Sequence, residues 1–318
     1  MSSSPAIQVS SLSKQFGELR AVDGLSFEVR SGEIFGLVGP DGAGKTTTLR
    51  ILAGVMGADS GSATVAGCDV IRDPESAKFH TSYMSQRFGL YEELTVDENI
   101  RFYADLFGVR RQQREPRSKE LLAAAALSDF RERLAGKLSG GMKQKLGLVC
   151  ALIHTPQVML LDEPTNGVDP VSRRDFWRLL YSLLAEGVAI LISTSYLDEA
   201  ERCHRVGLMH QGRMLFCDQP AELKKRFPGE ILAVHASQPG KVRDALTGAP
   251  GVRTALLVGD RVHLFVDEAA RRVPELRSRL EAAKVPFDSI DTVAPSIEDL
   301  FVSAVESQAP PAAETKHA

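Results

Sequence analysis

The sequence lacks paired cysteines. Its four cysteines, Cys68, Cys150, Cys203 and Cys217, are scattered along the chain, and none belongs to a C-x-x-C pair. Neither a zinc site nor a thioredoxin-like motif is therefore indicated. Scattered thiols fit a reducing cytosol, and free cysteines are among the most buried residue types, so we expect small buried side chains here.

Long apolar runs are also missing. No stretch approaches the roughly 18 apolar residues that a membrane span needs. The first ten residues, MSSSPAIQVS, contain neither a basic segment nor an apolar core, so the chain shows no secretory signal. We expect a protein that stays on the cytosolic side and reaches a membrane only through a partner.

Charge of one sign is not in excess. Lys plus Arg is 38 and Asp plus Glu is 41, which gives a formal net charge of −3. A dedicated nucleic-acid-binding protein usually shows a clear basic excess, so this balance argues against nucleic acid as a partner. With 318 residues, of which 43% are apolar, the chain is long enough for two globular domains.

The part of the chain before Phe227 has the pattern of an α/β domain. Alternation of apolar and polar residues from Ile7 to about Arg30 predicts antiparallel strands. Residues from about 88 to 155 are expected to be mainly helical, and Thr95 with Glu98 fits a capping box. Apolar runs that alternate with helical stretches predict a parallel sheet covered by helices. These runs are Glu33–Val38, Val158–Leu161, Val188–Ile192 and Arg205–Met209.

A shift in composition near Phe227 separates a second domain, residues 230–304. Its elements are predicted in the order strand, helix, strand, strand, helix, strand, which is typical of a ferredoxin-like α+β domain. The Gly259-Asp260 pair predicts a tight hairpin. A short helix, Ser296–Val302, should follow, and residues 305–318 are expected to be a disordered tail. The strands are expected at Ile231–Ala236, Thr254–Val258, Arg261–Val266 and Phe287–Val293, and the helices at Lys241–Leu246 and Ala269–Ala283.

The motif GPDGAGKT follows the predicted strand at residues 33–38 and precedes a predicted helix. Small residues let successive backbone N–H groups converge on phosphate oxygens, and the helix N-terminus adds its dipole. The Lys45 ammonium can reach the β- and γ-phosphates, and the Thr46 hydroxyl can bind Mg²⁺. The pattern predicts a nucleotide site formed by Gly39, Pro40, Asp41, Gly42, Ala43, Gly44, Lys45, Thr46 and Thr47.

A second motif, VMLLDEP, ends a predicted strand in two carboxylates. Consecutive strand residues face opposite sides of a sheet. Asp162 is therefore expected to hold Mg²⁺, while Glu163 points elsewhere, toward an attacking water.

A third motif, LSGG, places Ser139, Gly140 and Gly141 at the start of a predicted helix, which makes a second anion-binding nest. One ATP site does not need two nests on one subunit. Two head-to-tail subunits resolve this, because the nest of each can close over the γ-phosphate held by the other. We therefore expect a two-fold dimer that buries two ATP molecules.

The phosphate loop, LSGG and LLDEPT, in this order, resemble the ATP-binding subunits of ABC transporters over about residues 6–225. The segments FGLVGP, TNGVDP and YLDEAER resemble the type-2 exporters, the drug- and antibiotic-efflux group. The resemblance implies that Phe16 stacks on adenine, that Gln86 contacts the metal and the water, and that Asp169 lies in a loop crossing the interface between two cassettes.

The same resemblance implies a fold, ligands and partners. The fold is a P-loop NTPase cassette, with a mixed sheet, antiparallel N-terminal strands and a helical subdomain, followed here by the small α+β domain. The ligands are ATP and Mg²⁺, the metal being held by Thr46, Gln86 and Asp162. The partners are a polytopic membrane permease and a second cassette, in a homodimer or a heterodimer. The place is the cytoplasmic face of the cell membrane.

Three positions depart from the family pattern. Met142, directly after LSGG, stands where Gln is commonest, although exporters of this kind often have Met there. Asp41 stands where the family usually has Asn, and a carboxylate near phosphates is electrostatically unfavourable unless it points away. Ser195, in ISTSYLDEA, stands where the switch histidine belongs. In the family that histidine bridges the γ-phosphate and the catalytic carboxylate; the Ser195 hydroxyl reaches less far than an imidazole, so we expect this bridge to be left to a water. Nucleotide binding should then be normal and hydrolysis slow.

Three functions fit these motifs, and the favoured one is an energy-coupling ATPase of a membrane exporter. A soluble ABC-class ATPase that acts on ribosomes or DNA is disfavoured, because the chain has one cassette, no sustained heptads and a slight acidic excess. A slowly hydrolysing or non-hydrolysing ATP-dependent clamp is suggested by Ser195 but opposed by the presence of Glu163 and Gln86.

Overall fold

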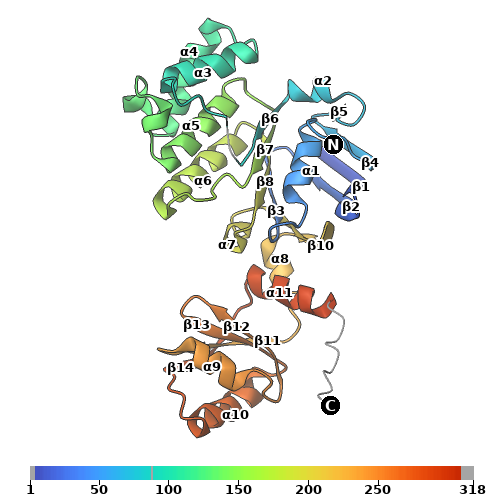
Figure 1. Cartoon of the computed structure of the whole chain (residues 1–318), viewed down its shortest axis with the longest axis vertical. Coiled ribbons are helices and arrows are strands. Elements are labelled where there is room, and N and C mark those ends of the chain that lie inside the picture. Colours follow the sequence, from blue (N-terminus) through green and yellow to red (C-terminus); the bar gives the residue numbers. More distant parts are fainter. Residues whose placement is uncertain (1–3, 87–88, 309–318) are drawn as a thin grey trace. The chain divides into compact units, whose positions relative to one another are not determined.

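The computed structural model describes residues 4–86 and 89–308 of the chain (Figure 1). The chain divides into two compact units, Met1–Pro220 and Ala221–Ala318, slightly before the end predicted for the cassette at residue 225. Among the described residues, no helix combines the length and the apolar character that crossing a bilayer requires.

The first unit begins with a four-stranded antiparallel sheet in the order β2-β1-β4-β5. The period-two alternation of the N-terminal sequence buries Ile7 and Val9 on one face of this sheet, as predicted, and Leu12 is buried after a register shift between Val9 and Leu12. The strands are β1 (Ile7–Phe16), β2 (Leu19–Val29), β4 (Ser60–Val65) and β5 (Cys68–Asp69).

A six-stranded sheet in the order β10-β9-β3-β8-β7-β6 forms the centre of the same unit. Its strands are parallel except for β10, which pairs antiparallel with β9 at one edge. Every residue of β3, β7 and β8 is buried, which explains why these strands are continuous apolar runs. The strands are β3 (Ile34–Val38), β6 (Thr81–Met84), β7 (Val158–Asp162), β8 (Ala189–Thr194), β9 (Arg205–His210) and β10 (Arg213–Asp218).

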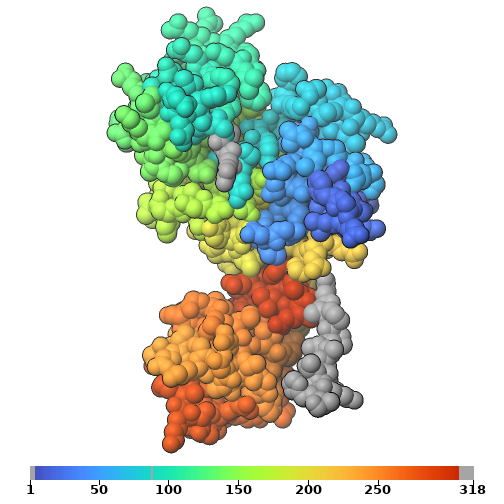
Figure 2. All heavy atoms as spheres, viewed as in Figure 1, coloured from blue at the N-terminus to red at the C-terminus, as the bar shows by residue number. Residues whose placement is uncertain are grey.

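The described part of the segment from 88 to 155 is mainly helical, as predicted; residue 88 itself lies outside the described residues. Thr95 and Glu98 form both halves of the capping box that starts α3. In the space-filling view, the green helical segment and the blue N-terminal strands form opposite flanks of this unit (Figure 2). The helices of the segment are α3 (Val96–Leu106), α4 (Arg111–Ala124) and α5 (Gly140–Leu152), with 3-10 turns at Ser128–Phe130 and Ala135–Lys137. The remaining helices before the second unit are α1 (Lys45–Leu52), α2 (Pro74–Lys78), α6 (Pro170–Leu184) and α7 (Leu197–Ala200), and α8 (Pro220–Lys224) spans the division.

The second unit has the predicted order of elements, and its antiparallel sheet has the strand order β12-β13-β11-β14. Val258 pairs with Arg261, so Gly259-Asp260 forms the predicted two-residue hairpin loop. The strands are β11 (Glu230–His235), β12 (Val252–Val258), β13 (Arg261–Val266) and β14 (Ser289–Val293), and the helices are α9 (Pro239–Leu246), α10 (Ala269–Ala282) and α11 (Ile297–Gln308).

The predicted start of a disordered tail at residue 305 is wrong, because α11 continues to Gln308. The helix is fixed at its start by the buried Asp299, which accepts hydrogen bonds from the Ser296 backbone and hydroxyl at 2.9 and 2.6 Å. The other oxygen of Asp299 lies 2.9 Å from His263 Nδ1 on β13. Residues 309–318 lie outside the described residues.

Candidate nucleotide site

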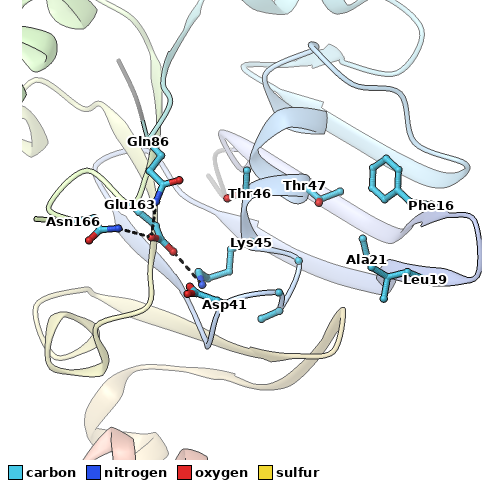
Figure 3. Close-up of a pocket in the computed structure, with 13 residues that line it drawn as sticks. Phe16, Leu19, Ala21, Asp41, Lys45, Thr46, Thr47, Gln86, Glu163 and Asn166 are labelled. Atoms are coloured by element: carbon cyan, nitrogen blue, oxygen red, sulfur yellow. Dashed lines mark hydrogen bonds and ion pairs between the residues drawn. The ribbon is translucent and has the colours of Figure 1, made fainter. Parts of the chain in front are cut away.

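One pocket of about 440 Å³ opens between the N-terminal strands and the carboxyl ends of the central strands (Figure 3). Phe16, Leu19 and Ala21 lie at one end of it, and Gln86, Glu163 and Asn166 lie at the other, with the phosphate loop between them. Most residues predicted from the motifs therefore meet in one place. The lining consists of Phe16, Leu19, Ala21, Asp41, Gly42, Ala43, Gly44, Lys45, Thr46, Thr47, Gln86, Glu163 and Asn166.

The phosphate loop joins β3 to α1, as its sequence predicts. Gly44 is the N-cap of α1 and has a φ of 101°, which glycine adopts without strain. A Cβ at Gly44 would lie 2.1 Å from the Ala21 carbonyl oxygen, and a Cβ at Gly39 would lie 2.2 Å from the Met209 carbonyl oxygen. The loop is thus packed too closely for side chains at these two positions, which fixes the N-terminus of α1 beside the pocket.

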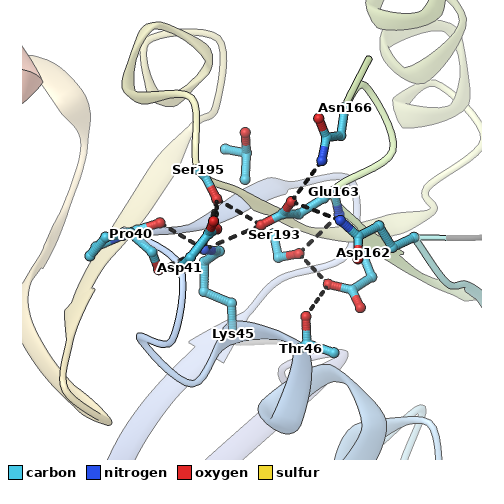
Figure 4. Close-up of polar contacts among 12 residues, drawn as sticks. Pro40, Asp41, Lys45, Thr46, Asp162, Glu163, Asn166, Ser193 and Ser195 are labelled. Carbon is cyan, nitrogen blue, oxygen red and sulfur yellow. Dashed lines mark hydrogen bonds and ion pairs between the residues drawn. The ribbon is translucent and has the colours of Figure 1, made fainter. Parts of the chain in front are cut away.

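Lys45 is only 4% exposed. Its ammonium donates to the carbonyl oxygens of Gly39 and Pro40 at 2.7 and 3.0 Å and to Ser195 Oγ at 3.1 Å (Figure 4). It also forms an ion pair with Glu163 Oε1 at 3.3 Å. Its positive charge is therefore directed into the centre of the site.

Asp162 is buried and lies where a magnesium ligand is expected. Its Oδ1 accepts hydrogen bonds from Thr46 Oγ1 at 2.9 Å and Ser193 Oγ at 2.7 Å. Tyr83 donates to Oδ2 at 3.3 Å, and burial together with the Asp162 charge raises the pKa of Tyr83 to about 12. Hydroxyl and carboxylate oxygens gathered beside a phosphate loop suit Mg²⁺, which binds through one or two carboxylates plus substrate phosphates.

The side chain of Glu163 lies in the same site as Asp162, and its direction differs from the one predicted. Strand alternation would send it away from Asp162, but β7 ends at Asp162 and Glu163 has a φ of 47°, in the left-handed region. Such a conformation costs about 1–3 kcal/mol and is concentrated at functional sites. It is held by the Glu163 N–H, which donates to the Ser193 carbonyl and hydroxyl oxygens, both at 3.1 Å.

Ser195 contacts Glu163 directly. Ser195 Oγ lies 2.7 Å from Glu163 Oε1 and 3.0 Å from Asp41 Oδ1 (Figure 4). The contact is short because the end of β8 and the Glu163 backbone approach each other closely: the Glu163 N–H pairs with Ser193, two residues before Ser195.

Gln86 and Phe16 both line the pocket. Gln86 Nε2 donates to Glu163 Oε2 at 3.4 Å, and Asn166 Nδ2 makes a contact of the same length. Phe16 is 46% exposed, so it is not a core side chain, and the Lys14 ammonium lies 5.6 Å from the centroid of its ring. Asn166, Ser193 and Tyr83 were not identified from the sequence. Asn166 could have been identified, because it lies only three residues after Glu163 in the sequence. Ser193 and Tyr83 could not, because they contact the site from separate strands.

The LSGG residues do not belong to the described lining of this pocket. Ser139 caps α5 by accepting from the Met142 N–H at 3.3 Å, and a Cβ at Gly141 would lie 2.4 Å from Ser172 Oγ. Gly141 therefore lies against the start of α6, whose N-cap is Asp169. Asp169 accepts hydrogen bonds from the backbone N–H groups of Ser172 and Val171 at the start of α6. These hydrogen bonds lower the pKa of Asp169.

A buried carboxylate, Glu199, supports the segment that carries Ser195. It accepts hydrogen bonds from Thr165 and Trp177 on one oxygen, at 2.8 and 3.3 Å, and from Thr194 on the other, at 2.9 Å. Glu199 thereby connects the loop after β7, the end of β8 and α6. The sequence motif contained this residue, but its role was not predicted.

Comparison with known proteins agrees with this geometry. A family model described as "ABC transporter" matches residues 22–166. The daunorubicin resistance ATP-binding protein DrrA2 of Streptomyces coeruleorubidus is 35% identical over 302 residues, which cover 93% of this chain and 94% of that protein. The Nod factor export ATP-binding protein I of Paraburkholderia xenovorans (strain LB400) is 37% identical and covers 87% of this chain and 91% of that protein.

A third relative is longer. The probable multidrug ABC transporter ATP-binding protein YbhF of Escherichia coli (strain K12) is 43% identical over 300 residues, and this chain spans about half of its length, 51%. Among solved structures, an ATP-binding subunit of an ABC transporter superposes with a TM-score of 0.64 at 30% identity, over 70% of this chain and 93% of that one. The fold and the site thus define an ATP-binding cassette. The chain belongs to the family of ABC transporter ATP-binding subunits.

Proposed function

We propose that this chain binds and hydrolyses ATP and thereby powers export through a membrane permease. The observation that carries the proposal is the meeting of Lys45, Thr46, Asp162, Glu163 and Gln86 around one pocket. Two relatives that this chain matches over nearly their full length are named as a daunorubicin resistance protein and a Nod factor export protein. These names support export as the direction of transport.

The residues of the chain have separate tasks in this proposal. The backbone N–H groups from Asp41 to Thr47 and the N-terminus of α1 bind the phosphates, and Phe16 stacks on the base. When ATP binds, the Lys45 ammonium breaks its contact with Glu163 and binds the β- and γ-phosphates instead. Glu163 then orients a water for in-line attack and accepts its proton.

The donor set also fits Mg²⁺. Thr46, Asp162 and Gln86 would hold the ion, which when bound neutralises charge on the phosphates. Ser193 and Tyr83 hold Asp162 in place from the neighbouring strands β8 and β6.

The LSGG segment is proposed to act on a second cassette. Ser139 and Gly140 are exposed at the start of α5 and lie outside the lining of their own pocket. A head-to-tail dimer would bring Ser139 and Gly141 of one subunit to the γ-phosphate of the other, with Asp169 in the interface.

A second pocket is proposed as the permease-binding surface at the cytoplasmic face of the membrane. It has a volume of about 390 Å³ and includes Val55, Phe79 and Leu106, which are 60, 72 and 65% exposed. Apolar side chains this exposed favour a protein partner. Tyr83, on the strand that leads to Gln86, lines the same pocket and connects it to the nucleotide site.

Slow turnover remains part of the proposal. The Ser195 hydroxyl reaches Glu163, but unlike an imidazolium it carries no positive charge for the γ-phosphate. Steady-state ATPase rates of the wild type, with and without the permease, measure this directly.

Substitution Glu163→Gln tests the proposed function. The amide keeps the shape of the side chain but removes the basic group, so we expect retained ATP binding and negligible turnover. Mg·ATP should also convert the variant to a stable dimer, measured by light scattering. The matched control is Glu18→Gln, an exposed position between Phe16 and Leu19, which should behave as wild type.

Two results would contradict the proposal. Unchanged turnover in Glu163→Gln would remove Glu163 from the chemistry. A variant that binds Mg·ATP but stays monomeric would exclude the homodimer and favour a partnership with a different cassette.

A further inference from the structure

Three charged groups meet at the Ser195 hydroxyl. Its oxygen accepts from Lys45 Nζ at 3.1 Å and lies 2.7 Å from Glu163 Oε1 and 3.0 Å from Asp41 Oδ1 (Figure 4). The hydroxyl has one hydrogen, so it donates to only one of the two carboxylates at a time. Two of the departures seen in the sequence, Asp41 and Ser195, are therefore in direct contact although they are 154 residues apart.

The contact with Ser195 is the shortest one made by the Glu163 carboxylate. Oε2 has two long contacts, at 3.4 Å, from Gln86 and Asn166. Oε1 has Ser195 at 2.7 Å and Lys45 at 3.3 Å. When Lys45 turns to phosphate, as the proposed function requires, Ser195 remains the main contact of Oε1.

We propose that Asp41 is a positioning residue for Glu163 that acts through Ser195. When the hydroxyl donates to Glu163, it fixes that carboxylate; when it donates to Asp41, it frees Glu163 Oε1 to accept from water. An ionised carboxylate competes for the hydroxyl, whereas an amide oxygen is a weaker acceptor. This inference rests on the proposed hydrolysis at the same site.

The charge of Asp41 has a second effect that the test must separate. The two hydrogen bonds through Ser195 place Asp41 Oδ1 within about 6 Å of Lys45 Nζ, inside the screening length of roughly 8 Å. Removing the charge therefore changes the field at the phosphates even if Ser195 plays no part. A comparison in the presence and absence of the Ser195 hydroxyl isolates the effect that passes through Ser195.

The experiment is a double-mutant cycle of wild type, Asp41→Asn, Ser195→Ala and the double variant. Asn keeps one oxygen acceptor and the shape of Asp41, which is exposed, and replaces the charged carboxylate by a neutral amide. In the background that keeps Ser195, we expect Asp41→Asn to lower kcat about tenfold, which is the size of effect expected when one charge-assisted hydrogen bond is weakened. In the Ser195→Ala background the same substitution should change kcat less than about twofold.

Binding supplies a readout that is independent of turnover. Calorimetry with Mg·ADP should give dissociation constants within about threefold of wild type for all four proteins, because both substitutions keep the backbone N–H groups and the Lys45 ammonium that bind the phosphates. Ser195→Thr keeps the hydroxyl and should preserve the dependence of kcat on Asp41. Glu18→Gln, which removes a carboxylate beside the same pocket, should leave kcat unchanged.

Several results would overturn the inference. One is an effect of Asp41→Asn on kcat that has the same size with and without the Ser195 hydroxyl. Another is a loss of Mg·ADP affinity in Asp41→Asn as large as its loss of kcat, which would show a merely structural role for Asp41. ATPase activity that depends on Glu163 but not on Asp41 would overturn this inference alone. Absence of any ATPase in the wild type, with and without its permease, would overturn the proposed function as well.

Discussion

Lys45 is held by four acceptors: two loop carbonyls, the Ser195 hydroxyl and the Glu163 carboxylate. Lys45→Ala removes the one cation in this cluster and leaves Glu163 and Asp41 facing the phosphates. We expect ATP affinity to fall about 100-fold or more, the size of effect of losing charge-assisted contacts to a phosphate. Calorimetry with Mg·ATP measures it, and Lys143→Ala, whose partner is Glu92 on the helical segment, is the control. Unchanged affinity would contradict the assignment of the loop.

Single residues of the site were predictable where one local pattern determines them. The loop from Gly39 to Thr46 and the carboxylate Asp162 follow from spacing beside a strand and a helix. The Glu163 position depends on a left-handed backbone that strand alternation does not anticipate. The contact of Asp41 with Ser195 depends on pairing between β3 and β8, which no local pattern encodes.

At the scale of elements, the end of α5 packs on the end of α3 through two rings. His154 stacks on Phe107 with ring centroids 3.7 Å apart and an interplanar angle of 5°. Both ring nitrogens of His154 are buried. Burial lowers the pKa of His154 to about 4, so the native state disfavours the proton.

This contact predicts a pH dependence of stability. Between pH 6.5 and about 4 the unfolded chain binds a proton at His154 that the native state does not, so stability falls as the pH falls through this window. The loss should reach about 3 kcal/mol at most. Urea unfolding at pH 7.5 and 4.5, followed by fluorescence of the single Trp177, measures it. His154→Phe keeps the stacking and should flatten the profile; an equally steep profile in that variant would exclude His154 as the cause.

Elements were predictable where their signals are local. The capping box at Thr95, the hairpin at Gly259 and the apolar runs of β3, β7 and β8 all gave correct elements. Strand β4, by contrast, has the sequence SGSATV, whose serines and glycine resemble a turn. It becomes a strand because it pairs with β1, more than 40 residues earlier in the chain.

At the scale of the whole molecule, every residue that lines the nucleotide pocket belongs to the first unit. A chain that ends at Pro220 should therefore bind Mg·ATP within about threefold of the full chain, as the ligand gains no contact from the second unit. Calorimetry on both chains measures this, and the Trp177 unfolding transition checks that the shortened chain is folded. Loss of binding by a folded shortened chain would show that the second unit contributes to the site.

Strand β3, which leads into the phosphate loop, pairs with strands that come much later in the sequence. In the central sheet β3 lies between β8 and β9, so Val38, at the entrance to the loop, pairs with Thr194 and Leu208. A growing chain on the ribosome cannot complete this pairing until residues up to about 208 have been released. Long-range parallel pairing of this kind is intrinsically slow. ATP therefore has no complete site to bind during most of the synthesis of the first unit, and acquisition of nucleotide binding should mark the final step of its folding.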